Sequence, residues 1–392
     1  MWSMQRSLGN KLTLAAVAIS SLSLFSGCPS GASNGGDNTI VIGHYASLSG
    51  SEATFGRSTD NGIQLAVEET NDAGGIDGKQ IRLITYDDKG ESNAAGAAVT
   101  RLVTSDNVTA VLGEVQSGLS LAGAPVCQEY KVPMISPSST NPRVTKVGDM
   151  IFRVCFIDSF QGYVCAKFAR ESAPVKADKI AVLYNQADPY STGLAEEFKK
   201  AFESMGGQVT IQEAYTGGDQ DFDPQLRKIR GTNPGMIFIP GYYTDVANIA
   251  IQARRLDINV PLLGGDGWDS ARLAEIAKEN IDGSFYSNHY AQQDPDPRVQ
   301  NFIAKYDAKY NAKPDGLAAL GYDAAMLLFD AMRRSESLSG PHLAKALAAT
   351  RDFAGVTGTI SIDAERNAVK PAVMLQMVKG VPTYLTTIEP PK

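Results

Sequence analysis

The chain has 392 residues, of which 36 are basic and 43 are acidic, and its formal net charge is −7. An acidic chain with no run of basic residues is a poor candidate for binding nucleic acid or an anionic membrane surface, so we expect neither as a partner. No apolar stretch approaches the 18 residues of a membrane-spanning helix, so we expect no membrane span.

The first 27 residues predict a signal peptide. Arg6 and Lys11 form a basic segment, and residues 12–25 form an apolar segment that is too short to cross a bilayer comfortably. Small residues precede Cys28, as in bacterial lipoprotein signals, in which the cysteine is acylated; a plain secretory signal is the alternative. Residues 28–38 predict a flexible tether. We therefore expect an exported protein, periplasmic or at the cell surface, that reaches the membrane only through a lipid on Cys28.

Removal of the signal peptide leaves 365 residues and a formal charge of about −9, because two basic residues are lost. A chain of this length is expected to form two lobes rather than one core. Besides Cys28, the chain contains Cys127, Cys155 and Cys165. Cys155 and Cys165 could form a disulfide or remain buried thiols, and the spacing is not that of a metal site.

Short β-branched segments alternate with segments of helical periodicity along the first part of the chain. The predicted strands are 39–45, 81–88, 108–114 and 132–136, and the predicted helices are 55–71, 92–105 and 117–130. Strands separated by helices of this length indicate βαβ units, in which a parallel sheet is covered on both faces.

The same alternation resumes after an interruption at 152–159. The predicted strands are 179–185, 208–215, 235–241 and 261–266, and the predicted helical segments are 190–205, 224–230 and 243–256. Long helices follow at 297–310 and 315–334, and the tail reads as hairpin-like strands at 353–363, 372–378 and 383–388.

This order predicts an α/β protein with two doubly wound parallel-sheet lobes, joined by several crossovers and separated by a cleft. The late helical pair suggests that the chain returns to the first lobe before it ends in the second. We therefore assign 39–156 and 288–370 to lobe 1, and 157–287 and 371–392 to lobe 2.

Motifs for catalysis are scarce. The only histidines are His44, His289 and His342, and none lies in a pair with metal-ligand spacing. The segment 71–80 fails as a phosphate-binding loop because it connects a helix to a strand and lacks two required residues. The sequence also has no G-x-S-x-G elbow, in which the serine lies between a predicted strand and a predicted helix. We therefore expect no enzyme activity, no metal and no cofactor.

Polar and aromatic side chains, in contrast, follow the carboxyl ends of the predicted strands. Ser117 begins a predicted helix directly after a strand, while Tyr190, Tyr242 and Asp266 follow three strands of the second run. In open α/β sheets ligands bind at this edge, where helix N-terminal N–H groups favour anions. Each residue alone is better explained as a helix cap, a loop aromatic or a solvated acid, but their common position predicts a binding cleft.

The segment ISPSSTNP, residues 135–142, ends the strand next to Ser117. Its two prolines exclude a helix interior or a central strand, so the segment is a turn. We expect the prolines to fix the backbone so that the Ser138 carbonyl and the Thr140 hydroxyl face the cleft, while Ser136 and Ser139 stabilise the turn itself.

The sequence resembles the substrate-binding proteins of branched-chain amino acid ABC transporters, which have the type 1 periplasmic-binding fold. The resemblance covers roughly residues 39–388 and rests on several segments together. These are GIQLAVEETNDAGGIDGKQIRLITYDD (62–88), VLGEVQSG (111–118), VPMISPSST (132–140), KIAVLYNQADPYSTGL (179–194) and GYDAAMLL (321–328).

The resemblance implies a role for each candidate residue. Ser117 and Thr140 would hold the α-carboxylate of an amino acid, and the Ser138 carbonyl and Asp266 would hold its ammonium group. Tyr190 and Tyr242 would close over the ligand. The side-chain pocket would be lined by Phe55, Leu317 and Trp268.

The charges of such a ligand need partners once it leaves water, and dividing the partners between two lobes makes closure depend on the ligand. Well-known relatives contain a disulfide whose cysteines would lie near Gly90 and Gln116. This chain has no cysteine at either place, so it departs from those relatives there.

We therefore expect a protein that captures a branched-chain or similar amino acid and delivers it to the permease subunits of an ABC importer. The alternative is a ligand-sensing receptor subunit for amino acids or related amides and carboxylates. Such a sensor would need a separate partner, since the chain has no output domain.

Overall fold

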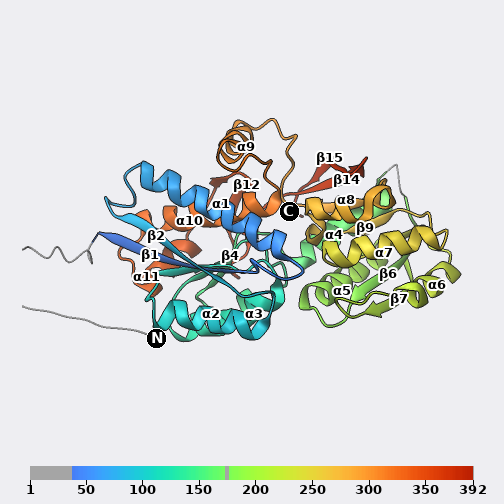
Figure 1. Ribbon diagram of the computed structural model, residues 1–392, viewed down its shortest axis with the longest axis horizontal. Coiled ribbons are helices and arrows are strands. Elements are labelled where there is room, and N and C mark those ends of the chain that lie inside the picture. Colours follow the sequence, from blue (N-terminus) through green and yellow to red (C-terminus); the bar gives the residue numbers. More distant parts are fainter. Residues whose placement is uncertain (1–37, 173–175, 392) are drawn as a thin grey trace, which may run out of the picture. The chain divides into compact units, whose positions relative to one another are not determined.

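The computed structural model describes residues 38–172 and 176–391. The predicted signal peptide, Cys28 and the tether up to residue 37 lie outside the described residues. From Asn38 onward the chain packs as one unit. Two β-sheets form its framework, each with helices on its faces (Figure 1).

The first sheet has five strands in the order β2-β1-β3-β4-β5, and all of its pairs are parallel. Its strands are β1 (Thr39–Ala46), β2 (Gln80–Asp87), β3 (Ala110–Leu112), β4 (Met134–Ser136) and β5 (Ile151–Arg153). Strands β3 and β4 and the edge strand β5 are buried throughout, as expected for a parallel sheet covered on both faces.

The second sheet has seven strands in the order β15-β14-β10-β9-β8-β6-β7. These are β6 (Lys179–Asn185), β7 (Gln208–Tyr215), β8 (Met236–Phe238), β9 (Leu262–Gly264), β10 (Phe285–Asn288), β14 (Ala372–Val378) and β15 (Val381–Ile388). Strands β6 to β10 are parallel, whereas β14 and β15 add an antiparallel hairpin at one edge. The predicted α/β fold with two parallel-sheet lobes is confirmed.

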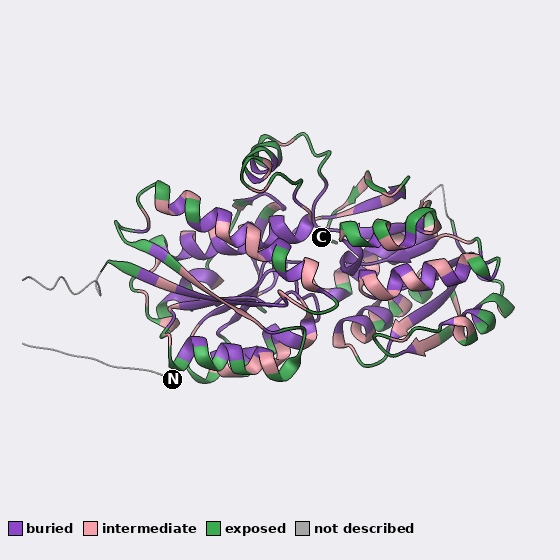
Figure 2. Cartoon of the chain, in the orientation of Figure 1, coloured by how far each residue is buried: buried purple, intermediate pink, exposed green. Residues whose placement is uncertain are grey.

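Helices cover both sheets, and their outward faces are exposed while the central strands are buried (Figure 2). In the first half they are α1 (Ala53–Asp72), α2 (Ser92–Thr104), α3 (Ser117–Glu129), α4 (Asp158–Glu171), α5 (Pro189–Ser204) and α6 (Asp223–Gly231). The remainder are α7 (Tyr243–Arg255), α8 (Ala271–Ala277), α9 (Pro297–Tyr310), α10 (Gly316–Arg334) and α11 (Gly340–Ala348). A small sheet of β11 (Phe353–Gly355), β12 (Gly358–Ile362) and β13 (Ala368–Val369) follows them.

The chain crosses between the two sheets three times. It leaves the first sheet after β5, returns from the second sheet after β10, and enters the second sheet again at β14. We call the parts around the five-stranded and seven-stranded sheets the first and second lobe. The residue boundaries assigned to the lobes from the sequence remain a prediction.

Helix α10 belongs to the first lobe because it packs closely against α1. A Cβ on Gly62 would lie 2.0 Å from the carbonyl oxygen of Ala318, and one on Gly321 would lie 2.4 Å from that of Thr59. A larger side chain at either glycine would therefore separate the two helix backbones. This contact places the first two turns of α10 beside the middle of α1.

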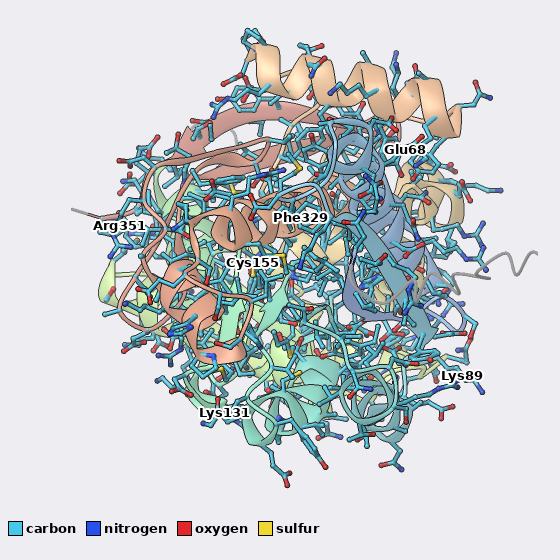
Figure 3. All side chains as sticks on the ribbon, turned by 90° about the vertical axis from the view of Figure 1, so that its left-hand side faces the viewer. Glu68, Lys89, Lys131, Cys155, Phe329 and Arg351 are labelled. Atoms are coloured by element: carbon cyan, nitrogen blue, oxygen red, sulfur yellow. The ribbon has the colours of Figure 1, made fainter. Side chains whose placement is uncertain are left out.

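The three cysteines of the described residues are buried free thiols, which settles the alternative left open for Cys155 and Cys165. Cys155 lies in the interior of the first lobe, whereas Glu68, Lys89, Lys131 and Arg351 lie at its periphery (Figure 3). Burial raises the pKa of both Cys155 and Cys165 to about 12, so neither thiol is reactive at neutral pH.

Within residues 38–172 and 176–391, no helix has the length and apolar character needed to cross a membrane. The sequence patterns miss several elements of the structure, among them β5, α4, α8, β10 and α11. Two of these, α4 and β10, bring residues to the site described next.

Candidate functional site

The carboxyl ends of both sheets carry the candidate residues at the start of the following helices. Ser117 is the first residue of α3 after β3, and Tyr190 lies in the first turn of α5 after β6. Tyr242 directly precedes α7, and Asp266 begins a short 3₁₀ helix, Asp266–Trp268, after β9. The order of the strands therefore brings these side chains to one place.

A cavity with about 260 Å³ of atom-free space lies at this place, between the two lobes. It is lined by Phe55, Val115, Ser117, Ser138, Tyr190, Tyr242, Asp266, Gly267 and Leu317. Seven of the nine ligand-binding residues expected from the sequence are in this lining. Val115 and Gly267 were not singled out, although both neighbour expected residues along the chain. Which of these residues contact a ligand remains a prediction.

Two expected residues, Thr140 and Trp268, do not line this cavity. Thr140 is fully buried, and its hydroxyl has no hydrogen-bond partner in the part of the chain that the structure describes. The Trp268 indole packs against Gly264 and donates to the Ile239 carbonyl at 3.0 Å. Trp268 therefore packs behind the cavity, whereas the resemblance implied that it lines the side-chain pocket.

The wall from the first lobe offers hydroxyl groups. The Ser117 Oγ accepts from the Asn141 N–H at 3.2 Å, so its own hydrogen remains available for a ligand. Ser136 and Ser139 instead bond within the turn, where Ser139 N–H donates to Ser136 Oγ at 2.9 Å and both hydroxyls donate to the Glu114 carbonyl. These contacts agree with the structural role expected for this pair.

The loops that carry this wall are held by a hydrogen-bond network, which we call the carboxyl clasp. The Ser47 hydroxyl donates to Asp88 Oδ1 at 2.8 Å, and the Ser47 N–H donates to Glu114 Oε1 at 3.1 Å. The Gln116 N–H donates to Glu114 Oε2. Burial raises the pKa of Glu114 well above its usual range. The clasp thus joins the ends of β1, β2 and β3 beside Ser117.

The wall from the second lobe is centred on Asp266, which is contacted by three side chains. The Gln161 amide donates to Asp266 Oδ1 at 2.8 Å, and the Tyr190 hydroxyl donates to the same oxygen at 3.0 Å. His289 Nε2 lies 3.1 Å from Asp266 Oδ2, and burial lowers the pKa of His289 to about 4, which keeps the ring neutral. Three side chains from α4, α5 and the end of β10 therefore fix the position of the Asp266 carboxyl group at the cavity.

Sequence reasoning missed Gln161 and His289 in this role. Gln161 lies on α4, and His289 directly follows β10, and neither element is apparent from the sequence pattern. Only the strand order could have located His289. Strand β10 pairs in parallel with β9, so the residue that follows β10 lies beside Asp266, which follows β9.

Aromatic rings form the apolar part of the cavity. The rings of Tyr190 and Tyr242 stack with centroids 5.3 Å apart, and the rings of Phe55 and Tyr242 form a T-shaped pair with centroids 5.7 Å apart. Leu317, from the first turn of α10, completes this part of the lining. An aliphatic side chain would be buried against these rings.

Hydrogen bonds between the lobes surround the cavity. The Tyr243 hydroxyl donates to the Ser51 carbonyl at 2.7 Å, and the Asn141 amide donates to the Pro189 carbonyl at 2.7 Å. On another side the Gly316 N–H donates to Asp269 Oδ2 at 2.7 Å. These bonds show the lobes in a closed arrangement.

The residues that the structure describes contain no group of three or more His, Cys, Asp or Glu side chains in a metal-binding arrangement. The cavity instead combines hydroxyl donors on one wall, a carboxylate on the other and apolar rings between them. Such a surface complements a small molecule that carries a negative group, a positive group and an apolar side chain.

A fold of two α/β lobes closed around such a cavity defines a binding protein for small molecules. Residues 39–382 match the family model of the periplasmic binding proteins. The chain belongs to this family, which consists of binding proteins and not of enzymes.

Named relatives are similar over most of their length. The chain is 30% identical over 346 residues to Leu/Ile/Val-binding protein homolog 2 of Brucella abortus. The aligned region covers 87% of this chain and 91% of that protein. It is 29% identical over 328 residues to the leucine-, isoleucine-, valine-, threonine- and alanine-binding protein of Pseudomonas aeruginosa, with coverage of 83% and 86%.

Solved structures show the same similarity. A leucine-binding protein from Thermotoga maritima has a TM-score of 0.86 and 37% identity, over 90% of this chain and 99% of that chain. A branched-chain amino acid transporter substrate-binding protein from Streptococcus pneumoniae, in complex with isoleucine, has a TM-score of 0.84 and 35% identity, over 90% and 100%.

Proposed function

We propose that this protein is the extracytoplasmic substrate-binding subunit of an ABC importer and that it captures a branched-chain amino acid. The observation that carries the proposal is the cavity, in which Ser117 and Ser138 face Asp266 across the rings of Tyr190 and Tyr242. An amino acid with an aliphatic side chain offers the matching carboxylate, ammonium and apolar groups. The names of the similar proteins support leucine, isoleucine and valine as the first candidates.

In this proposal the first lobe binds the α-carboxylate and the second lobe binds the ammonium group. Each lobe alone would leave one charge of the ligand unpaired, so the closed arrangement is favoured when the ligand is present. The closed form is then presented to permease subunits in the membrane. A lipid on Cys28 would keep the protein close to them.

Calorimetric titration of the purified protein with the common amino acids tests this function. We expect saturable binding of one or more of leucine, isoleucine and valine, and no binding of acidic or basic amino acids. Binding of none of the three would contradict the proposal, and a preference for an aromatic acid without an amine would replace the proposed ligand class.

Closure of the lobes also brings acidic groups together at the edge of the cavity. Glu52 of the first lobe is 8% exposed, and burial together with the charge of Asp245 raises its pKa to about 8. Burial raises the pKa of Asp188 and of Asp245, both in the second lobe, to about 6. A carboxyl whose pKa is raised in the closed form stabilises that form as long as the carboxyl is protonated. For Glu52, this stabilisation of the closed form is complete below about pH 4.5 and is lost as the pH rises to about 8.

We therefore expect Glu52→Gln to increase ligand affinity at alkaline pH, because glutamine cannot ionise. The ratio of variant to wild-type affinity should be close to one near pH 4.5 and at least about three near pH 8.5. This value is conservative, because a pKa shift of several units corresponds to a larger change in affinity. Titrations at several pH values measure this ratio. A ratio that stays constant with pH would show that Glu52 does not take up a proton on closure.

A further inference from the structure

A second cavity lies between the lobes, apart from the one proposed to hold the amino acid. It has about 1260 Å³ of atom-free space, and none of its lining residues lines the first cavity. The second lobe contributes Asp269 and Ala274, before and within α8, and Leu375 of β14, whereas the first lobe contributes Asp315 and Gly316 at the start of α10. The cavity is therefore built by both lobes, and the proposed capture of an amino acid does not use it.

Two carboxyl groups, one from each lobe, line this second cavity near one another. Asp269 Oδ2 accepts from the Gly316 N–H at 2.7 Å, so it reaches the residue next to Asp315. Asp315 Oδ1 accepts from the Ala318 N–H at 2.9 Å and from the Ser58 hydroxyl. Burial and the charge of Asp269 raise the pKa of Asp315 to about 7, because like charges repel. Closure of the lobes therefore brings the two carboxyl groups together at a cost in electrostatic free energy.

Within the described residues, no basic side chain forms an ion pair with either of these carboxyl groups. Lys313 lines the same cavity, but its Nζ lies 2.7 Å from Oδ2 of Asp307. Arg272 of α8 pairs with Glu275, with 2.6 Å between Nη1 and Oε2. Asp269 is 6% exposed, so solvent and salt screen its charge only weakly. A cation bound in the cavity would relieve the repulsion between the two carboxyl groups.

Tyr290 is an independent indication that this cavity holds a ligand. It lines the cavity, it is 4% exposed, and its hydroxyl has no hydrogen-bond partner in the part of the chain that the structure describes. Its ring is supported by an edge contact with Phe302, with centroids 6.5 Å apart. Burial raises the pKa of Tyr290, and the charges of Asp269 and Asp315 raise it further, so the hydroxyl lies near both carboxyl groups. Buried hydroxyls are almost always paired, so this one predicts a polar group in the cavity.

The cation that suits these residues is organic. Among residues 38–172 and 176–391, no three or more His, Cys, Asp or Glu side chains are arranged to hold a metal ion. The wall beside the carboxyl groups also contains the apolar side chains of Ala291, Leu375 and Val381. An ammonium or guanidinium group offers several donors to carboxylates, and an attached aliphatic chain would be buried against this wall.

We propose that the second cavity binds a small aliphatic amine or guanidine, and that this cation stabilises the closed arrangement of the lobes. The inference goes beyond the proposed function, because this ligand is not the transported amino acid. Asp315 belongs to the first lobe and Asp269 to the second, so the cation contacts both carboxyl groups only when the lobes are closed. A ligand that favours the closed form raises the affinity for any other ligand of that form, and the effect is reciprocal.

Calorimetric titration of n-butylamine and n-butylguanidine into the leucine-saturated protein tests the site directly, because leucine then occupies the first cavity. We expect saturable binding of at least one of these cations. We expect no binding of n-butyrate, which has a chain of similar length and the opposite charge. Sodium chloride at the same ionic strength provides the reference heat. If neither cation bound saturably, the proposal would be overturned.

Two variants assign the bound cation to this cavity. Asp315→Asn removes one charge and keeps an acceptor for the Ala318 N–H, and it should weaken cation binding by more than about tenfold. Tyr290→Phe removes only the unpartnered hydroxyl, so it should weaken cation binding by about threefold or more without lowering the urea midpoint of the ligand-free protein. The control Asp257→Asn removes an exposed charge elsewhere and should bind the cation as the wild type does. Unchanged cation binding in Tyr290→Phe and in a folded Asp315→Asn would place the cation elsewhere and reject the proposal.

The effect on closure is measured by titrating leucine in the presence of the saturating cation. We expect the affinity for leucine to rise by at least about threefold in the wild type, and to respond less in Tyr290→Phe at the same cation concentration. A wild-type affinity that ignores the cation would reject the stabilisation of the closed form. If the protein bound none of leucine, isoleucine and valine, the proposed function would fail, and titration of the cation into the ligand-free protein would still decide whether the second cavity binds it.

Discussion

Replacing Asp266 with alanine is expected to weaken the binding of a branched-chain amino acid by more than about tenfold. The change removes the carboxylate proposed to bind the ammonium group and leaves that charge without its partner in the closed cavity. It also removes the acceptor of the Gln161 amide and the Tyr190 hydroxyl and the contact of His289, so the wall from the second lobe loses its order. Calorimetric titration with leucine measures the loss.

The control for this experiment is Asp257→Asn, which removes one negative charge from the second lobe at an exposed position after α7. It should bind leucine as tightly as the wild type, since exposed charges contribute little. If Asp266→Ala bound leucine as well as this control, the assignment of the ammonium group to Asp266 would be wrong.

Trp268→Ala is expected to produce the largest loss of stability, about 3–5 kcal/mol, which is typical for truncation of a buried tryptophan. Trp268 is 1% exposed, its indole covers Gly264, and its N–H donates to the Ile239 carbonyl. Truncation therefore leaves a cavity and an unpaired carbonyl beneath the turn that carries Asp266. Urea unfolding of the ligand-free protein measures this change.

The milder variant Trp268→Phe serves as a comparison, because it keeps most of the ring and loses the hydrogen bond. Its midpoint should lie between those of the wild type and the alanine variant. Equal midpoints for all three proteins would show that Trp268 does not support the second lobe.

The alternation of strands and helices was predictable because parallel strands are continuous apolar runs and their helices have amphipathic periodicity. The convergence of Ser117, Tyr190, Tyr242 and Asp266 followed from the same pattern, since all four follow strand ends. This part of the site depends on local sequence and on the general rule for α/β sheets.

The remaining part depends on features that local sequence does not reveal. Strand β10 has only four residues, Phe285–Asn288, and contains no β-branched residue. Helix α4 begins at Asp158 without a side-chain cap and follows the interruption between the two strand runs. With both elements unrecognised, Gln161 and His289 could not be placed beside Asp266.

The positions of Thr140 and Trp268 illustrate a second limit. Both neighbour cavity residues along the chain, yet both point into the packing behind the cavity wall. The direction of a side chain in a tight turn depends on backbone angles that are fixed by tertiary contacts, such as those of the Ser136–Ser139 pair.

The carboxyl clasp has a consequence for the conditions in which the protein can mature. In this chain Ser47, Asp88, Glu114 and Gln116 join the loops near the positions at which well-known relatives have a disulfide, and the described cysteines are buried thiols elsewhere in the fold. The geometry of the wall that carries Ser117 therefore arises without oxidation of any thiol. We therefore expect reducing surroundings to leave this wall intact, because the described part of it contains no disulfide.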